Sequence, residues 1–271
     1  GDAQLNNISD VNLGATWDEP PAAAQPGSPG VPALDSGDLR VPSAVTFQNN
    51  LFWGVHGVGT DGGTAGVQWF KFDTDRDLVQ SGVLSDSSMD YIYPSISVND
   101  WGDVVIGYTG VSSSNFASAY AVTGTTDSGG TTTFRPPVLL QAGASDYQNI
   151  DTRGRNRWGD YSATVVDPSR PWVFWTFQEW AKGTNNWATQ ITEIAPVTPD
   201  LYGYGFNVTP EPLDAGQAFD VEYQLRNGAA RPSTHTEVGF YLSTNSFISE
   251  GDLLLSTDTV PPIAALDFSA M

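Results

Sequence analysis

The chain of 271 residues contains no cysteine and only two histidines, His56 and His235. Disulfides and thiolate metal sites are therefore excluded, and a histidine-based zinc centre is not expected. Positive charge is also scarce, since 11 Lys and Arg stand against 31 Asp and Glu and give a formal net charge of −20. A chain of this charge repels phosphate backbones, so we expect no nucleic-acid partner.

Long apolar runs are missing as well, and none approaches the roughly 18 residues that cross a bilayer. We therefore expect no membrane insertion. A glycine-rich, aspartate-rich chain without cysteine is typical of secreted bacterial proteins, so we expect an extracellular or cell-surface bacterial location. No enzymatic cofactor is expected.

Three stretches of the chain resemble one another, at 42–46, 94–98 and 161–165, and each opens a series of apolar strands. Repetition on a scale of roughly 50 residues with several strands per unit is typical of a β-propeller. The sequence therefore predicts an all-β fold made of four-stranded blades. The predicted strands are 45–47, 51–55, 66–72 and 78–84, then 95–98, 104–108, 117–123 and 134–140, then 162–166, 172–177 and 187–194.

The chain divides into two predicted domains, 1–195 and 196–271. Residues 18–38 are rich in Pro, Gly and Ala, and this composition predicts a long loop with little to bury. Only three repeat units are clear, whereas propellers have about four to eight blades. We expect either a piece of a longer polypeptide or an incomplete array of blades.

Beyond residue 196 the apolar residues alternate again, at Val221, Tyr223 and Leu225 and then at Val238 and Phe240. This pattern predicts half-buried strands of an immunoglobulin-like β-sandwich. Such a domain needs about 100 residues, so we expect the C-terminal sandwich to be truncated.

Two resemblances to known families follow from short motifs. The segment 155–163, with Val166-Asp167-Pro168 and Phe174-Trp175-Thr176 after it, resembles the sialidase-like, or BNR-repeat-like, propellers of bacterial extracellular proteins. The tail, with Asp214-Ala215-Gly216 and the run 238–244, resembles a CARDB domain, an immunoglobulin-like adhesion module. The second resemblance implies a spacer or adhesion role.

The Asp-box of sialidase-like propellers also has a degenerate counterpart here. Residues 125–131 match its position in a predicted hairpin, but Thr132 stands where the family has tryptophan. The resemblance implies a structural role, in which the Asp127 carboxylate holds the turn together.

Sialidase chemistry, as the resemblance implies it, needs three arginines, a tyrosine nucleophile paired with glutamate, and an aspartate acid/base. The candidate catalytic residues are Asp160, Tyr161 and Glu179. Two structural alternatives stay open. Asp160 could instead accept backbone hydrogen bonds at the start of a strand, and Glu179 could be a solvated strand end.

A basic loop is the strongest candidate for ligand binding. Arg153, Arg155 and Arg157, followed by Trp158, gather three of the eleven cations within five residues. Guanidinium groups grip carboxylates with two parallel bonds, so the loop predicts an anionic ligand such as an acidic sugar. Alternatively, these arginines pair with Asp151, Asp160 and Asp167 and connect neighbouring blades.

Aromatic and acidic side chains supply two further candidates. Trp101 and Trp180 stand beside turn residues and are candidate stacking surfaces for sugars, although most tryptophans are expected in the core. Asp73, Asp75 and Asp77 have the alternating carboxylates of a calcium loop, so Ca²⁺ is a candidate ligand there. A charged turn on a blade edge is the alternative.

The sequence thus predicts a secreted or surface protein that binds an extracellular partner, a glycan or another surface protein, without chemistry of its own. Two other function classes stay open. One is a glycoside hydrolase of sialidase type, whose arginines and carboxylate would converge on one pocket. The other is a structural stalk without a ligand.

Overall fold

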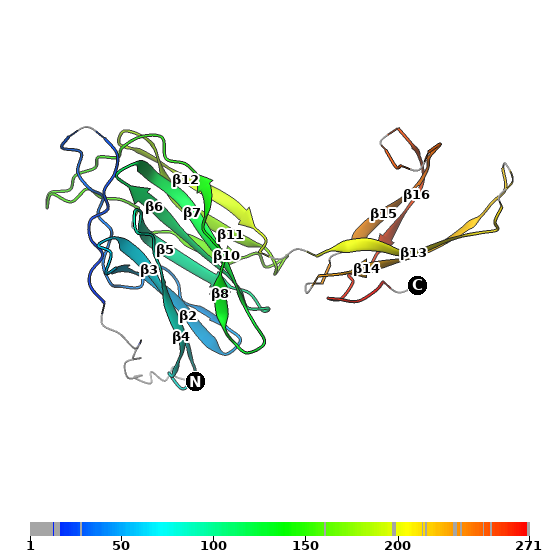
Figure 1. Cartoon of the computed structure of the whole chain (residues 1–271), viewed down its shortest axis with the longest axis horizontal. Helices are drawn as coiled ribbons and strands as arrows, with labels where there is room; N and C mark the ends of the chain where they lie inside the picture. Colours follow the sequence, from blue (N-terminus) through cyan, green and yellow to red (C-terminus); the bar gives the residue numbers. More distant parts are fainter. Residues whose placement is uncertain are drawn as a thin grey trace, which may run out of the picture. The chain divides into compact units, whose positions relative to one another are not determined.

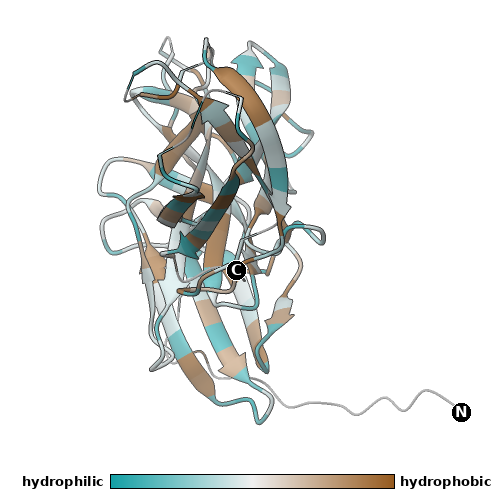
Figure 2. Cartoon of the chain, turned by 90° about the vertical axis from the view of Figure 1, so that its right-hand side faces the viewer, coloured by the Kyte–Doolittle hydropathy of each residue, from teal (hydrophilic) through white to brown (hydrophobic). Residues whose placement is uncertain are grey.

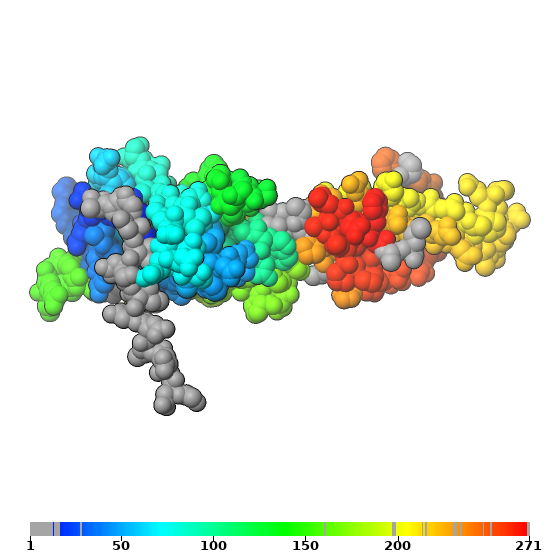
Figure 3. Space-filling model, turned by 90° about the horizontal axis from the view of Figure 1, so that it is seen from below, coloured from blue at the N-terminus to red at the C-terminus, as the bar shows by residue number. Residues whose placement is uncertain are grey.

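We describe the fold from a computed structural model of the chain. It describes residues 13, 17–27, 29–159, 161–196, 199–212, 214, 216–229, 232–233, 235–245, 247–249 and 251–269. All regular elements in these residues are β-strands, which confirms the all-β class (Figure 1). The chain forms two compact units, Gly1–Pro196 and Val197–Met271. Their atoms run from blue to green and from yellow to red in Figure 3.

The first sheet is a four-stranded antiparallel meander in chain order. Its strands are β1 (Thr46–Gln48), β2 (Leu51–Gly59), β3 (Ala65–Asp73) and β4 (Leu78–Leu84). The four predicted strands of the first repeat unit are therefore confirmed. Consecutive apolar residues, such as Phe52-Trp53 in β2 and Trp69-Phe70 in β3, place apolar side chains on both faces of this sheet, because successive residues of a strand point to opposite faces.

The second sheet corresponds to the second repeat unit. Its strands are β5 (Asp90–Val98), β6 (Asp103–Ser112), β7 (Asn115–Thr126), β8 (Thr132–Phe134) and β9 (Val138–Gln141). The predicted strand 134–140 is wrong as a single element, because β8 and β9 both pair with β7 and are separated. Pro136 and Pro137 lie between them, and proline cannot donate to a strand ladder.

The third sheet contains β10 (Ala163–Val166), β11 (Phe174–Gly183) and β12 (Asn186–Ile194), again antiparallel and in chain order. The three strands predicted for the third unit are present. Within the described residues, the strand pairing does not close the three sheets into a ring.

The second sheet lies between the other two and packs against both. Trp53 and Val55 of β2 meet Ile106 of β6 in one core, and Val105 of β6 meets Phe174 of β11 in the next. As a result, every residue of β5 and β6 is buried. Figure 2 shows the apolar residues concentrated within the strands.

A buried polar cluster also joins the second and third sheets. The Ser95 hydroxyl lies 2.9 Å from the Thr164 hydroxyl, and Thr164 lies 3.0 Å from the Thr176 hydroxyl. The Gln178 amide nitrogen donates to both Ser95 and Thr176. Gly107 faces this cluster, and a Cβ there would lie 2.2 Å from the Gln178 nitrogen.

Residues 18–38, which we call the strap, are not a loop with little to bury. Ala23 and Leu34 form an antiparallel bridge and are fully buried, and Leu34 also bridges Asn156 in parallel. The Gln25 amide donates to the Tyr147 carbonyl oxygen at 2.8 Å. The prediction of a loop was wrong about burial because two isolated apolar residues reach the core without any strand pattern.

The described residues of the second unit form two antiparallel strand pairs. They are β13 (Leu201–Thr209) with β14 (Asp220–Asn227), and β15 (Thr236–Leu242) with β16 (Leu253–Val260). The Tyr223 hydroxyl donates to Asp258 at 2.8 Å, and the Tyr223 and Phe240 rings lie 5.1 Å apart, so the two pairs are in contact. No helix in the described part of the chain is long and apolar enough to cross a membrane.

Candidate functional site

A pocket of about 600 Å³ opens where the strap meets β5 and the loop that leads into β10. Its walls combine three arginines, three carboxylates and two tyrosines with small residues. The lining residues are Glu19, Asp35, Ser36, Gly37, Asp38, Arg40, Val41, Pro42, Gly57, Tyr93, Pro94, Arg155, Arg157 and Tyr161. The strap, which precedes the first sheet, and the loop 155–161, which precedes the third, therefore meet beside β5 of the second sheet.

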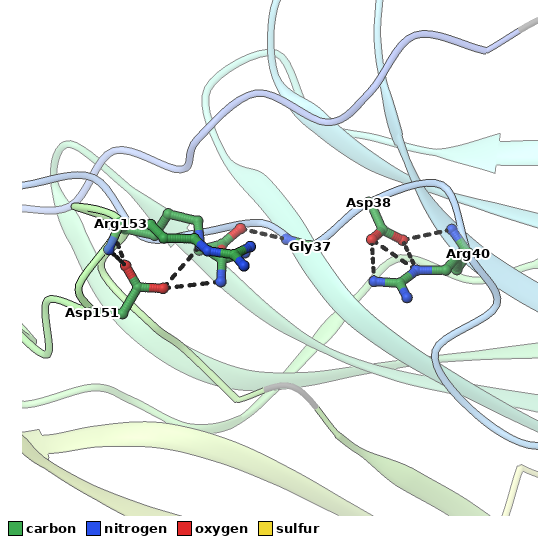
Figure 4. A network of polar contacts seen from close by, with 7 residues as sticks. Gly37, Asp38, Arg40, Asp151 and Arg153 are labelled. Atoms are coloured by element: carbon green, nitrogen blue, oxygen red, sulfur yellow. Dashed lines mark hydrogen bonds and ion pairs between the residues drawn. The ribbon is translucent and has the colours of Figure 1, made fainter.

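Arg40 follows the strap, two residues beyond its end, and pairs with Asp38. Its Nε donates to both carboxylate oxygens of Asp38 at 2.9 Å, and this bonding holds the pKa of Asp38 below its usual value. Both side chains are accessible to solvent, so the pair contributes little to stability. Figure 4 shows this pair and, beyond Gly37, the Asp151 carboxylate beside Arg153.

Arg155 holds the loop to the strap. Its Nη2 lies 2.9 Å from the Asp151 carboxylate, and its Nη1 lies 3.3 Å from the Asp35 carboxylate. The Asp35 backbone N–H also donates to the Asn156 carbonyl at 2.9 Å. The alternative in which an arginine of the basic loop pairs with Asp151 is therefore confirmed for Arg155.

Tyr93 is one of the residues that line the pocket. It is buried, it sits at an irregularity in the β5–β6 register, and its φ of 50° is rare for a residue with a side chain. The Ser162 hydroxyl donates to its carbonyl at 2.8 Å. Burial and, secondarily, the Asp35 carboxylate raise the pKa of Tyr93 above its usual value.

A recurrent five-residue turn shapes the basic loop. The Asp151 carboxylate accepts bonds from the Arg153 and Arg155 backbone N–H groups, and the Asp151 N–H donates to the Arg155 carbonyl. The same bonds close the turn at Asp127, the Asp-box counterpart. Its predicted structural role is therefore confirmed.

A similar turn accounts for the carboxylates of the proposed calcium loop. The Asp73 carboxylate accepts the Asp77 N–H at 2.9 Å, and the Arg76 N–H donates to the Asp73 carbonyl. In the described residues, no group of three His, Cys, Asp or Glu side chains is arranged to hold a metal ion. Asp73, Asp75 and Asp77 therefore lie in a hydrogen-bonded charged turn, as the alternative predicts, and Ca²⁺ binding there stays a prediction.

Two of the three candidate catalytic residues, Tyr161 and Glu179, lie in the described part of the chain, and they do not share the pocket. Tyr161 lines the pocket and is 80% exposed. Glu179 lies on β11, outside the pocket lining, with its carboxylate against Gly159, and burial raises its pKa. The prediction that Glu179 ends a strand is wrong, because β11 continues to Gly183, and the side chain is half-buried. Asp160 lies outside the described residues.

Of the remaining candidates for ligand binding, two arginines line the pocket and the other residues do not. Arg155 and Arg157 line the pocket, whereas Arg153 does not. The prediction for Trp158 is wrong, because its ring is buried against Tyr147 and its Nε1 donates to the Thr109 hydroxyl. Trp101 and Trp180 are half-buried and lie away from the pocket lining.

Several lining residues were missed by sequence reasoning. Asp35, Asp38 and Arg40 belong to the strap or follow it directly, and the strap's composition predicted only a loop. The available signal was the placement of two carboxylates and an arginine just before the first strand of the repeat. Tyr93 precedes the repeated segment 94–98, but nothing in the sequence marks its left-handed backbone.

The site can hold a small polar ligand. Guanidinium groups bind carboxylates, aspartate and glutamate oxygens accept bonds from hydroxyl groups, and tyrosine rings offer flat apolar surface. Comparison of the chain with protein-family models, with curated proteins and with solved structures finds no match in any of the three.

Proposed function

We propose that this chain is part of a secreted or cell-surface bacterial protein, and that its first unit binds an acidic glycan in the pocket without chemistry of its own. The observation that carries this proposal is the convergence of Arg40, Arg155 and Arg157 on one pocket. In a chain with a net charge of −20, these are three of only eleven cations. A carboxylate-bearing sugar fits a pocket that offers both guanidinium donors and carboxylate acceptors.

We also propose a propeller architecture for the first unit and an immunoglobulin-like architecture for the second. Three consecutive antiparallel sheets, each packed on the next, support blades of a sialidase-like propeller, and the two strand pairs of the second unit support a CARDB-like immunoglobulin domain. In this proposal the chain belongs to a longer polypeptide, and the second unit acts as a spacer or adhesion module.

A sialidase-type hydrolase is the second candidate, and one observation favours it. Arginines from segments leading into two different sheets share a pocket with Tyr93, Tyr161 and carboxylates. Two findings weigh against it. Arg40 and Arg155 are paired with aspartates, and the pKa of Tyr93 is raised, whereas a nucleophilic tyrosine needs help in losing its proton.

The binding proposal is tested by titrating the whole chain with sialylated and glucuronate-bearing oligosaccharides and with their neutral counterparts by calorimetry. We expect binding of the acidic sugars only. Arg157→Ala should weaken it about 10-fold to 100-fold, the value of a lost hydrogen bond to a charged group. The matched control Arg135→Ala, at an exposed position outside the pocket lining, should bind as the wild type does.

Two results would change the assignment. Equal binding of acidic and neutral sugars, or unchanged binding by Arg157→Ala, would contradict the carboxylate site. Release of sialic acid from the same oligosaccharides, abolished by Tyr161→Phe or Tyr93→Phe, would establish the hydrolase instead. The absence of any binding and of any turnover would favour the structural stalk.

A further inference from the structure

The charges that line the pocket balance one another. The lining contains three arginines and three carboxylate side chains, so its formal charges cancel. An anionic ligand is attracted to a guanidinium only to the extent that no carboxylate of the protein already neutralises it. The ion pairs inside the pocket therefore decide which arginine can receive the ligand.

The pair between Arg40 and Asp38 is the accessible one. The Arg40 Nε donates to both oxygens of the Asp38 carboxylate at 2.9 Å, and Nη2 donates to one of them (Figure 4). Asp38 thus occupies an edge of the guanidinium that can bind a carboxylate with two parallel bonds. The Arg40 side chain is 88% exposed and that of Asp38 is 36% exposed. Ion pairs as accessible as this one contribute little, so another carboxylate can replace the aspartate.

Arg155 is held by two carboxylates instead of one. Its Nε and Nη2 bond to Asp151 at 3.0 Å and 2.9 Å, and its Nη1 lies 3.3 Å from Asp35. The side chains of the two aspartates are only 22% and 16% exposed. Asp151 closes the turn of the basic loop and Asp35 belongs to the strap, so a ligand that displaced them would separate two walls of the pocket. Arg155 therefore braces the site, whereas Arg40 can change partners.

We propose that Asp38 is an internal competitor of the ligand, which lowers the affinity of the pocket for a carboxylate by holding Arg40. A ligand carboxylate either displaces Asp38 from Nε and Nη2 or binds at Nη1 and shares one positive charge with it. In both arrangements the aspartate opposes binding. Because Asp38 acts on the binding of an acidic sugar in the same pocket, the inference rests on the proposed function.

The test compares three variants in which a carboxylate becomes an amide, Asp38→Asn, Asp35→Asn and Asp86→Asn. Each changes the net charge of −20 by the same single unit, so the long-range attraction of an anion changes equally. The amide oxygen that replaces the carboxylate can still accept the backbone N–H of Arg40, Gly37 or Ser88, respectively. Each turn is therefore retained, and circular dichroism should show all three variants folded.

Calorimetry with the sialylated and glucuronate-bearing oligosaccharides should show tighter binding by Asp38→Asn. We expect a gain of about twofold to fivefold, the range that an exposed ion pair contributes. Asp35→Asn should show no such gain, because Asp151 still occupies Nε and Nη2 of Arg155. Asp86→Asn, outside the pocket lining, is the matched reference for the change in net charge.

A double-mutant cycle tests whether Asp38 acts through Arg40. The gain should vanish once the guanidinium is removed, so Asp38→Asn combined with Arg40→Ala should bind as Arg40→Ala does. Unchanged or weaker binding by Asp38→Asn, an equal gain in either of the other amide variants, or a gain that persists without Arg40 would overturn the inference and leave the carboxylate site in place. If neither wild type nor Asp38→Asn bound acidic sugars, the proposed function itself would be rejected, and this inference with it.

Discussion

At the scale of single residues, the contact between the second and third sheets depends on a glycine. Gly107 has no side chain where Gln178 and Thr176 bond across the sheets, and a Cβ would come within 2.2 Å and 2.3 Å of their polar atoms. Protein interiors are packed as densely as organic crystals, so such an overlap cannot be absorbed without movement.

Gly107→Ala should therefore lower the free energy of unfolding by about 1–3 kcal/mol, the usual cost of overpacking. Urea denaturation followed by tryptophan fluorescence measures this change. Gly62→Ala is the matched control, because a Cβ there meets nothing closer than 3.7 Å. Equal stabilities of the two variants would contradict the role assigned to Gly107.

Lys71 is a second residue whose effect on the stability of the fold can be measured. It is fully buried, its Nζ donates to the Gly130 carbonyl at 2.6 Å and to the Thr132 hydroxyl at 2.9 Å, and the Trp53 ring lies 4.8 Å away. Burial lowers the pKa of Lys71. The folded protein therefore releases this proton at a lower pH than the unfolded chain does.

The free energy of unfolding should consequently rise with pH between the lowered pKa of Lys71 in the folded protein and its pKa of about 10.4 in the unfolded chain. In that pH range the unfolded state binds more protons than the folded state does. Lys71→Met removes this contribution. Urea denaturation at several pH values should show the wild type gaining stability relative to Lys71→Met as the pH rises. Parallel pH profiles would show that Lys71 does not titrate in this window.

At the scale of elements, the strap and the basic loop form one structure that holds the pocket. Asn156 is buried, its amide nitrogen donates to the Pro32 and Tyr147 carbonyls, and its amide oxygen accepts the Asn149 N–H at 2.7 Å. Its own carbonyl accepts the Asp35 N–H. The position of one pocket carboxylate thus depends on this asparagine.

Asn156→Ala should cost about 2–4 kcal/mol, because it leaves buried carbonyl and N–H groups without partners. It should also weaken acidic-sugar binding, even though Asn156 does not line the pocket. Thermal unfolding and calorimetry measure the two effects. The exposed Asn186→Ala serves as control. A variant with full stability would show that the strap is held by other contacts.

The same elements show what sequence patterns can and cannot predict. Short apolar runs bounded by turn residues predicted the strands of the three sheets, because strands covered on both faces, such as β6, are buried along their whole length and so carry apolar residues on both faces. The strap escaped prediction because Ala23 and Leu34 are buried singly and follow no period. Eight of the fourteen residues that line the pocket lie in that segment or just after it. Arg155 and Arg157 were identified, since clustered cations are conspicuous in an acidic chain.

At the scale of the whole molecule, the two units differ in how much they bury. Buried apolar side chains form three clusters in the first unit. In the second unit, large apolar side chains of β13, β15 and β16 remain exposed, among them Phe206, Leu242 and Leu253. Hydrophobic burial is the main stabilising contribution, so the second unit should be the less stable one.

The distribution of tryptophan makes this difference measurable. All nine tryptophans precede residue 196, so their fluorescence reports on the first unit alone, whereas far-ultraviolet circular dichroism reports on the strands of both. On heating, we expect circular dichroism to change at a lower temperature than tryptophan fluorescence does. Coincident transitions would indicate a single cooperative unit instead.

The second sheet, which is covered on both faces, also has a consequence for folding during synthesis. The strands that cover Val105 and Ala121 emerge last from the ribosome among those of the first unit. Until they arrive, the nascent chain presents a bare apolar surface of the kind that chaperones bind. A stop codon ahead of β10 would make that transient exposure permanent, and the truncated product would aggregate.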